Sequence, residues 1–323
     1  MTSVKVVTSD GKIWRPEKTY LELVHASQQG PVELDLLSEG PCCQTSGIND
    51  MLTSIINQFN FDPTLYTIIT SNQLTSSQYR ERKTSWCELD LAKTHSRQHI
   101  ATESTLKKKF AIFIGRSNWQ RLGLASYLWA NYKDCTTMTY HFDSSIDYHI
   151  ANFGLEDLIL KEPSSRSHVY SFIEQLPIRP KVMNYPISWN QDAFDLEKYY
   201  QDIFCEIVCE TYFTGRTFFL TEKTLRSIIN GRPFMVQGPK WFLRNFKKLG
   251  FKTFSDWWDE GYDEDPSDSR CATLKNGIDW VAQQTPDTIN AWYQEMQPTL
   301  EHNRQILQQL NHEKILETEF FYE

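Results

Sequence analysis

Along the first hundred residues, short runs of apolar residues alternate with segments whose apolar residues recur at helical spacing. The run Val32–Leu37 predicts a buried strand, and a loop around Gly40 follows it. A helix capped by Ser46 or Asn49 comes next, and Leu65–Gln73 predicts a second buried strand. The residues expected on the apolar face of that helix are Met51, Ile55, Ile56 and Phe59. This order of strand, loop, helix and strand is typical of a parallel sheet, and the segment 84–92 is a candidate for a further strand.

The same order of strand, helix and strand begins again after a polar stretch between Lys83 and Lys109. Phe110–Arg116 predicts a clean buried strand, a helix follows it, and 136–142 predicts the next strand. The residues expected on one stripe of that helix are Leu122, Ala125, Leu128 and Trp129. We therefore expect two α/β domains that face one another. Their expected bounds are 1–105 and 106–300, with a C-terminal helix at 301–323.

Further along, one stretch contains the sequence signals that begin a helix, end it and begin a strand. The helix begins at Thr221 or Thr224 and ends at Gly231, and a strand begins at Pro233. Upstream, the spacing of Cys205 and Cys209 fits neighbouring turns of a helix. The last helical stretch is expected to be interrupted near Pro298.

The charge and composition of the chain argue against several classes of function. The net charge of −8 argues against a broad binder of nucleic-acid backbones, which needs clustered Lys and Arg. No apolar stretch approaches the roughly 20 residues of a membrane helix, and the first residues do not form a signal peptide, so we expect a cytoplasmic protein without membrane insertion. The seven Cys include no CxxC pair, and structural zinc is not expected.

The candidate chemistry centres on Thr221, Glu222 and Lys223. A helix N-terminus after a strand binds phosphate well, because free N–H groups and partial positive charge gather there. Lys223 would add a full charge, and Glu222 could accept hydrogen bonds from a ribose diol. An acidic first turn is also favoured by the helix dipole alone, so a purely structural role stays open.

The segment from Cys205 to Pro239 resembles the donor-binding signature of α1,3-fucosyltransferases. In that signature a strand ends in Glu, a loop leads to Thr-Glu-Lys, and a helix precedes a Pro-start strand that ends in Gly-Pro. The matching residues here are Glu210, Thr221, Glu222, Lys223, Pro233 and Gly238. The family's Glu-Asn pair is Glu210-Thr211 in this chain, which changes the contact expected from the Asn. Upstream, Asn118 and Arg121 match the family's strand-Ser-Asn-Arg element, with Arg116 as a rival for the diphosphate contact.

The resemblance implies the GT-B architecture, in which two Rossmann-like α/β domains face a central cleft. It also implies a nucleotide-sugar donor on the second domain and transfer without a metal or other cofactor. Inverting transfer needs a general base on the acceptor side, and Glu39, at the end of the strand that begins at Val32, is the candidate; a role in the loop before Gly40 is the alternative. A stretch at 250–270 is similar to uncharacterised glycosyltransferase-like proteins of tailed phages.

Several alternatives therefore remain open. The acceptor can be a glycan or a hydroxymethylated pyrimidine in DNA, and the chain can also be a non-catalytic protein that binds a nucleotide or another protein. For His141 and His149 a structural role is expected. Trp257 and Trp258 can stack on a sugar or pack a loop, and packing is the expected role. The oligomeric state does not follow from the sequence.

Overall fold

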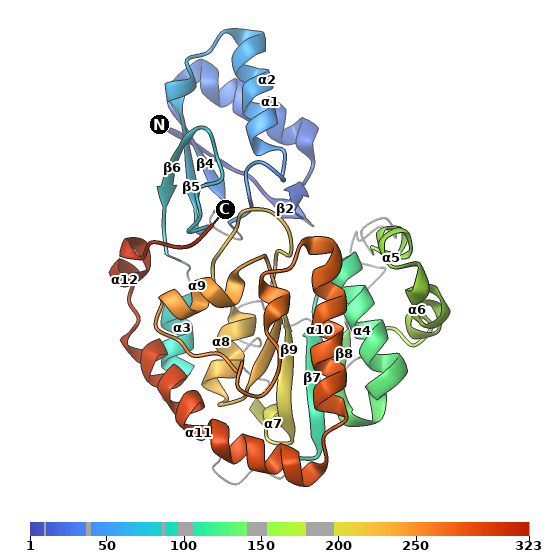
Figure 1. Cartoon of the computed structure of the whole chain (residues 1–323). Coiled ribbons are helices and arrows are strands. Elements are labelled where there is room, and N and C mark those ends of the chain that lie inside the picture. Colours follow the sequence, from blue (N-terminus) through green and yellow to red (C-terminus); the bar gives the residue numbers. More distant parts are fainter. Residues whose placement is uncertain are drawn as a thin grey trace. The chain divides into compact units, whose positions relative to one another are not determined.

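The chain is an α/β protein with two compact units, each built on a four-stranded parallel sheet (Figure 1). The computed structural model describes residues 1–9, 11–36, 40–85, 88–95, 106–140, 154–178 and 197–322. Unit 1 comprises Met1–Cys87, Thr211–Leu220 and Leu310–Glu323, and unit 2 comprises Glu88–Glu210 and Thr221–Gln309. The chain thus passes between the units at four points, which differ from the expected boundaries after residues 105 and 300.

In unit 1 the strands follow one another across the sheet in the order β1-β4-β5-β6. These strands are β1 (Thr2–Lys5), β4 (Val32–Leu36), β5 (Tyr66–Thr70) and β6 (Arg80–Lys83). A short antiparallel pair, β2 (Thr8–Ser9) and β3 (Lys12–Ile13), lies outside this sheet. The helices are α1 (Pro16–Gln29), α2 (Ile48–Phe59), the 3₁₀ turn η1 (Pro63–Leu65) and α12 (His312–Glu317).

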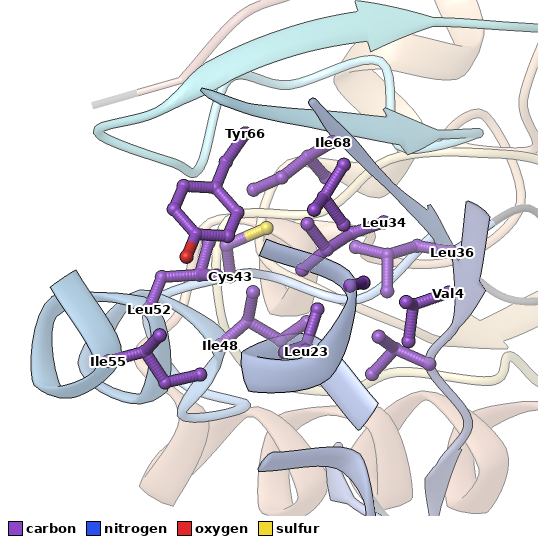
Figure 2. Close-up of a cluster of buried hydrophobic side chains, with 13 residues drawn as sticks. Val4, Leu23, Leu34, Leu36, Cys43, Ile48, Leu52, Ile55, Tyr66 and Ile68 are labelled. Carbon is purple, nitrogen blue, oxygen red and sulfur yellow. The ribbon is translucent and has the colours of Figure 1, made fainter. Parts of the chain in front are cut away.

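The core of unit 1 is apolar and draws on β1, α1, β4, α2 and β5 (Figure 2). In β4 the buried positions Val32, Leu34 and Leu36 alternate with half-buried acidic positions, which is the period of a strand with one apolar face. Helix α1 contacts β1, β4 and α2. Because apolar burial contributes about 25 cal/mol per Å², this cluster stabilises unit 1.

In unit 2 the sheet order is β10-β9-β7-β8, with every neighbouring pair parallel. These strands are β7 (Lys108–Ile114), β8 (Thr136–Tyr140), β9 (Ile203–Cys209) and β10 (Phe234–Gln237). The α-helices are α3 (Glu88–His95), α4 (Trp119–Tyr132), α5 (Leu155–Lys161), α6 (Arg166–Ile173), α7 (Glu197–Tyr200), α8 (Glu222–Ile229), α9 (Phe242–Lys248), α10 (Ser267–Ala282) and α11 (Pro286–Gln309). Short 3₁₀ turns are η2 (Lys133–Cys135), η4 (Pro163–Ser165) and η5 (Gly261–Asp263).

Three sequence-based expectations in unit 2 are wrong. Cys205 and Cys209 lie on strand β9, because a spacing of four also repeats on one face of a strand. Of the strand expected at 84–92, residues 88–92 are helical instead: helix α3 begins at Glu88 and packs against α8. Helix α11 runs through Pro298 without interruption, since buried Met296 and Leu300 hold it on both sides of the proline. That packing outweighs the roughly 3 kcal/mol that proline costs inside a helix.

In unit 1 the expected cap of α2 is also wrong. The N-cap is Gly47 at φ 87, and neither Ser46 nor Asn49 caps the helix. Asn49 instead uses its carboxamide to hold the loop after β5: it donates to the Ser76 carbonyl at 3.3 Å and accepts from the Ser77 hydroxyl at 2.8 Å. Across the described ranges of the chain, no helix combines the length and the apolar content needed to cross a bilayer.

Candidate functional site at the carboxyl end of the unit 2 sheet

The strand order of unit 2 reverses between β7 and β9. From β7 the chain continues to β8 on one side, and it then returns to β9 and β10 on the other side. In open parallel sheets, ligands bind outside the carboxyl ends of the strands at such a reversal. The residues that follow β7 and β9 are therefore the strongest candidates for a ligand site.

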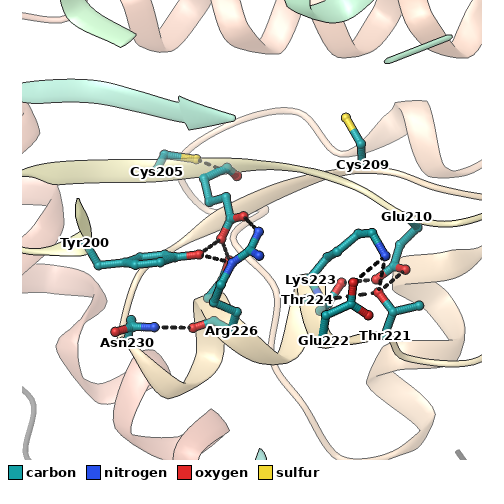
Figure 3. Close-up of polar contacts among 12 residues, drawn as sticks. Tyr200, Cys205, Cys209, Glu210, Thr221, Glu222, Lys223, Thr224, Arg226 and Asn230 are labelled. Atoms are coloured by element: carbon teal, nitrogen blue, oxygen red, sulfur yellow. Dashed lines mark hydrogen bonds and ion pairs between the residues drawn. The ribbon is translucent and has the colours of Figure 1, made fainter. Parts of the chain in front are cut away.

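Glu210 directly follows β9 and is only 5% exposed. Its two carboxylate oxygens accept hydrogen bonds from the hydroxyls of Thr221 at 2.7 Å and Thr224 at 2.5 Å (Figure 3). Burial raises the pKa of Glu210, and the charge of Lys223 and the two hydroxyls offset part of that rise. Glu210 therefore holds the first turn of α8 against the end of β9.

Helix α8 begins as the sequence predicts, with Thr221 as its N-cap. The hydroxyl oxygen of Thr221 accepts from the backbone N–H of Lys223 at 3.2 Å. Lys223 Nζ donates to Glu222 Oε1 at 2.7 Å, and the two side chains are 18% and 22% exposed. The acid and the base that the sequence suggested for two different ligand groups are thus paired with each other.

Glu222 interacts with a second cation besides Lys223. Burial opposes its ionisation, but Lys223 and Arg226 together hold the pKa of Glu222 below its ordinary value. Arg226 lies four residues later on α8, which places both side chains on the same side of the helix. The charge of Glu222 therefore keeps a compensating partner if Lys223 turns toward a ligand.

Beneath α8, Arg226 belongs to a buried polar network that the sequence analysis did not identify. Its guanidinium donates to the Tyr200 hydroxyl at 2.5 Å (Figure 3). It also donates to Glu206 Oε1 at 2.5 Å, and Ser227 donates to Glu206 as well. Burial opposes the charge of Arg226, yet Glu206 and Tyr200 raise its pKa. Glu206 on β9 and Glu210 directly after it are four residues apart, and both carboxylates accept hydrogen bonds from side chains of the α8 segment. The spacing of four between the two glutamates, and the same spacing between Glu222 and Arg226, are the sequence features that could have predicted this network.

The residues after β7 are buried as well. Asn118 caps α4, and its side chain accepts from the Arg121 N–H at 2.9 Å. The Arg121 guanidinium donates to the carbonyls of Glu210 at 2.8 Å and Arg116 at 3.1 Å. Arg121 thus ties the end of β9 to the loop after β7, across the point where the strand order reverses.

The chain itself covers the first turn of α4. Gly154 packs so closely there that a Cβ on it would lie 2.0 Å from the backbone nitrogen of Trp119. Gly154 has φ 75, a left-handed conformation that glycine adopts most easily. Asn118 and Arg121 are each less than 10% exposed. The amino end of α8, with its partly exposed Glu222 and Lys223, is therefore the better candidate for contact with a ligand.

The remaining candidate residues lie elsewhere. Thr211 is half-buried and begins the segment Thr211–Leu220, which belongs to unit 1. Glu39, His141 and His149 lie outside the described residues. Trp258 has the expected packing role: it is 3% exposed, and its ring centroid lies 5.5 Å from that of Phe254.

The arrangement can bind an anion and a polyol together. The amino end of α8 offers backbone dipoles and the Lys223 ammonium for an anion, and Glu222 offers an acceptor for hydroxyl groups. Within the described ranges, no group of three or more His, Cys, Asp or Glu side chains is arranged to hold a metal ion. No protein-family model matches the chain, and no curated protein is significantly similar to it.

Proposed function

We propose that this protein is a GT-B-type glycosyltransferase that moves a sugar from a nucleotide-sugar donor to an acceptor hydroxyl without a metal ion. The observation that carries the proposal is the amino end of α8. There Thr221, Glu222 and Lys223 follow a parallel strand beside the reversal of strand order. A nucleoside diphosphate presents both groups that such a site suits, an anionic diphosphate and a sugar diol.

Lys223 is the residue assigned to the donor diphosphate. It leaves Glu222 for the phosphate when the donor binds, and Arg226 continues to compensate the charge of Glu222. Glu222 then accepts hydrogen bonds from donor hydroxyls. A cation at this position also neutralises the charge that develops on the leaving diphosphate in the transfer step.

Glu210 and Arg121 have positioning roles in this proposal. Both oxygens of Glu210 already accept threonine hydroxyls, and the Arg121 guanidinium already donates to backbone carbonyls. They fix the first turn of α8 and the end of β9, and Asn118 holds Arg121 through the cap of α4. The donor contacts themselves fall to Glu222, Lys223 and the backbone N–H groups of α8.

No observation favours a DNA base over a glycan as the acceptor. Within the cluster at 79–83, Arg80–Lys83 form β6, where Arg82 pairs with Glu33 at 2.9 Å and Lys83 donates to the Gln73 carbonyl. Of the cluster at 104–109 the structure describes residues 106–109, and there Lys107 pairs with Asp202 at 3.2 Å. A glycan hydroxyl therefore remains the proposed acceptor.

The first test is nucleotide binding by Lys223→Ala. A charge-assisted hydrogen bond contributes about 1.5–3 kcal/mol, so the dissociation constant for the best nucleoside diphosphate should rise roughly tenfold to hundredfold. Thermal-shift screening against GDP-, UDP-, CMP- and dTDP-sugars selects that ligand, because a ligand of the native state raises the melting temperature. Lys18→Ala removes an exposed lysine of α1 and is the matched control. Equal affinity in all three proteins would remove Lys223 from the site.

A chelator tests the second part of the proposal. Lys223 and the dipole of α8 supply the positive charge for the leaving group, so transfer should continue at an unchanged rate in EDTA. The rate is measured as nucleotide release that depends on acceptor. Loss of turnover in EDTA and its return with manganese would contradict the proposed roles.

A further inference from the structure

Within unit 2, helices α8 and α9 begin at the same edge and on the same face of the sheet. Phe234 on β10 is the register partner of Glu206 on β9, so both side chains point to one face of this parallel pair. On that face, Glu206 accepts from the Arg226 guanidinium of α8. The Phe234 ring packs against Phe246 of α9, with ring centroids 5.7 Å apart. The first turn of α8 is bonded to Glu210 after β9, and α9 begins shortly after the carboxyl end of β10. The residues between β10 and α9 therefore share the edge and the face on which α8 begins.

Trp241, the last residue before α9, has a left-handed backbone with φ 62 and ψ 23. Glycine adopts this conformation most easily, and a bulky side chain makes it costly. Among the described residues other than glycine, only Arg15 and Asn60 share a positive φ. Strained positions of this kind cluster at binding sites and active sites, where the surrounding structure enforces them.

Hydrogen bonds on both sides enforce the backbone conformation of Trp241. Its N–H donates to the Asp263 carbonyl in η5 at 2.7 Å. The buried Asp263 carboxylate in turn accepts from the N–H groups of Leu243 and Arg244, at 2.8 and 3.0 Å, in the first turn of α9. The residue is therefore fixed between η5 and α9, which gives its ring a defined position at the edge of the sheet.

The indole ring of Trp241 is partly exposed and already attracts a partner to its face. Nζ of Lys240 lies 4.0 Å from the ring centroid. A cation over a partly exposed ring is held weakly, whereas a base that stacks on an aromatic side chain is held more strongly. A flat aromatic ligand can therefore take the place of the ammonium over the ring.

We infer that Trp241 is the stacking platform for the base of the nucleotide that binds at the amino end of α8. This assignment rests on the proposed function, in which Lys223 binds the diphosphate and Glu222 accepts from the sugar hydroxyls. Trp241 supplies the contact to the remaining part of the nucleotide. Because every base has a π-face, the stack favours nucleotides over phosphates that carry no base and discriminates little among the bases.

The test compares nucleotides with inorganic pyrophosphate, which has no base. Trp241→Gly removes the indole, and glycine suits the left-handed backbone, so the melting temperature is expected to show a retained fold. The dissociation constants of UDP and GDP should rise about 5-fold to 150-fold, while that of pyrophosphate stays unchanged. Trp241→Phe keeps an aromatic ring and should bind both nucleotides more tightly than Trp241→Gly does.

The matched control is Trp129→Ala on α4. There too a lysine lies over the ring, with Nζ of Lys133 5.7 Å from the centroid, and nucleotide affinity should stay at the native value. If Trp241→Gly does not fold, Trp241→Leu replaces it, because leucine keeps an apolar side chain without a π-face.

Two outcomes would overturn the assignment of Trp241. One is unchanged affinity for UDP and GDP in the variant without the ring, and the other is an equal loss of affinity for pyrophosphate, which would make Trp241 a support of α9 only. The proposed function fails separately if Lys223→Ala binds every probe as the native protein does while Trp241→Gly still loses nucleotide affinity. A native protein that binds none of the probes contradicts both.

Discussion

The two sheets have four parallel strands each, but their carboxyl ends are built differently. In unit 1 the strands add in one direction, and Asn72 and Gln73, which follow β5, are bonded to the segment Thr211–Leu220. In unit 2 the order reverses between β7 and β9, and the edge holds Arg121, Glu210 and Lys223.

This difference indicates which of the two sheets is suited to hold a ligand site at its carboxyl end. A monotonic sheet has no reversal at which neighbouring connections separate, so its edge can be closed by the chain's own carboxamides. Charges at a buried edge cost desolvation free energy and need partners. Unit 2 keeps such charges at the reversal, and this supports placing the donor there and treating the unit 1 edge as a structural closure apart from Glu39.

Glu39→Gln gives the largest expected effect and tests whether unit 1 supplies chemistry at all. Glu39 lies outside the described residues, so its role as general base stays a prediction. General-base catalysis typically contributes about 10²–10⁴-fold, and transfer should fall by that factor while donor affinity stays unchanged. Initial rates and titration calorimetry separate the two.

The control is Asp50→Asn, which changes another carboxylate in unit 1, on α2. Near-normal transfer in Glu39→Gln would place the base elsewhere. A parallel loss of donor binding would give Glu39 a structural role in its loop.

Glu206→Gln tests the dependence of unit 2 on buried charge. It leaves Arg226 buried without its carboxylate, and removing one partner of a buried pair costs about 3–5 kcal/mol. Urea denaturation measures the free energy of unfolding.

The matched change in unit 1 is Glu33→Gln, which breaks the more exposed pair with Arg82. An exposed pair contributes about 0–1 kcal/mol, so the two variants should differ severalfold. Similar losses in both would mean that the two units do not differ in this respect.

Asp263→Asn gives the smallest of these effects and concerns the start of α9. Asp263 is 7% exposed and accepts from the N–H groups of Leu243 and Arg244 at 2.8 and 3.0 Å. Burial, only partly offset by these bonds, raises its pKa from 3.8 to about 6. Because the folded state holds the proton more tightly, stability is lost as the pH rises from about 4 to about 6, by up to about 3 kcal/mol.

The variant should flatten this part of the curve of unfolding free energy against pH. Asp256→Asn, at an exposed position in the same acidic segment, should leave the slope unchanged. A wild-type curve that rises over the same pH range and is not altered by Asp263→Asn would contradict the assignment.

Local patterns were enough for much of the secondary structure. The alternation of Val32, Leu34 and Leu36 predicted β4, and Thr221 and Gly231 predicted the two ends of α8. These features depend on neighbours within one turn or on the period of one strand, and such information is present in the sequence itself. Two α/β units with parallel sheets also followed from the order of the elements.

Only the tertiary structure decided which side chains meet. The sequence suggested one ligand group each for Glu222 and Lys223, but folding pairs them and adds Arg226 beneath. It likewise turned Glu210 and Arg121 inward onto threonine hydroxyls and backbone carbonyls. The segment Thr211–Leu220 belongs to unit 1 because it is bonded to Gly40 and Asn72. These partners are more than 140 residues away in the chain. Contacts over such separations depend on the assembled sheet, and no local period encodes them.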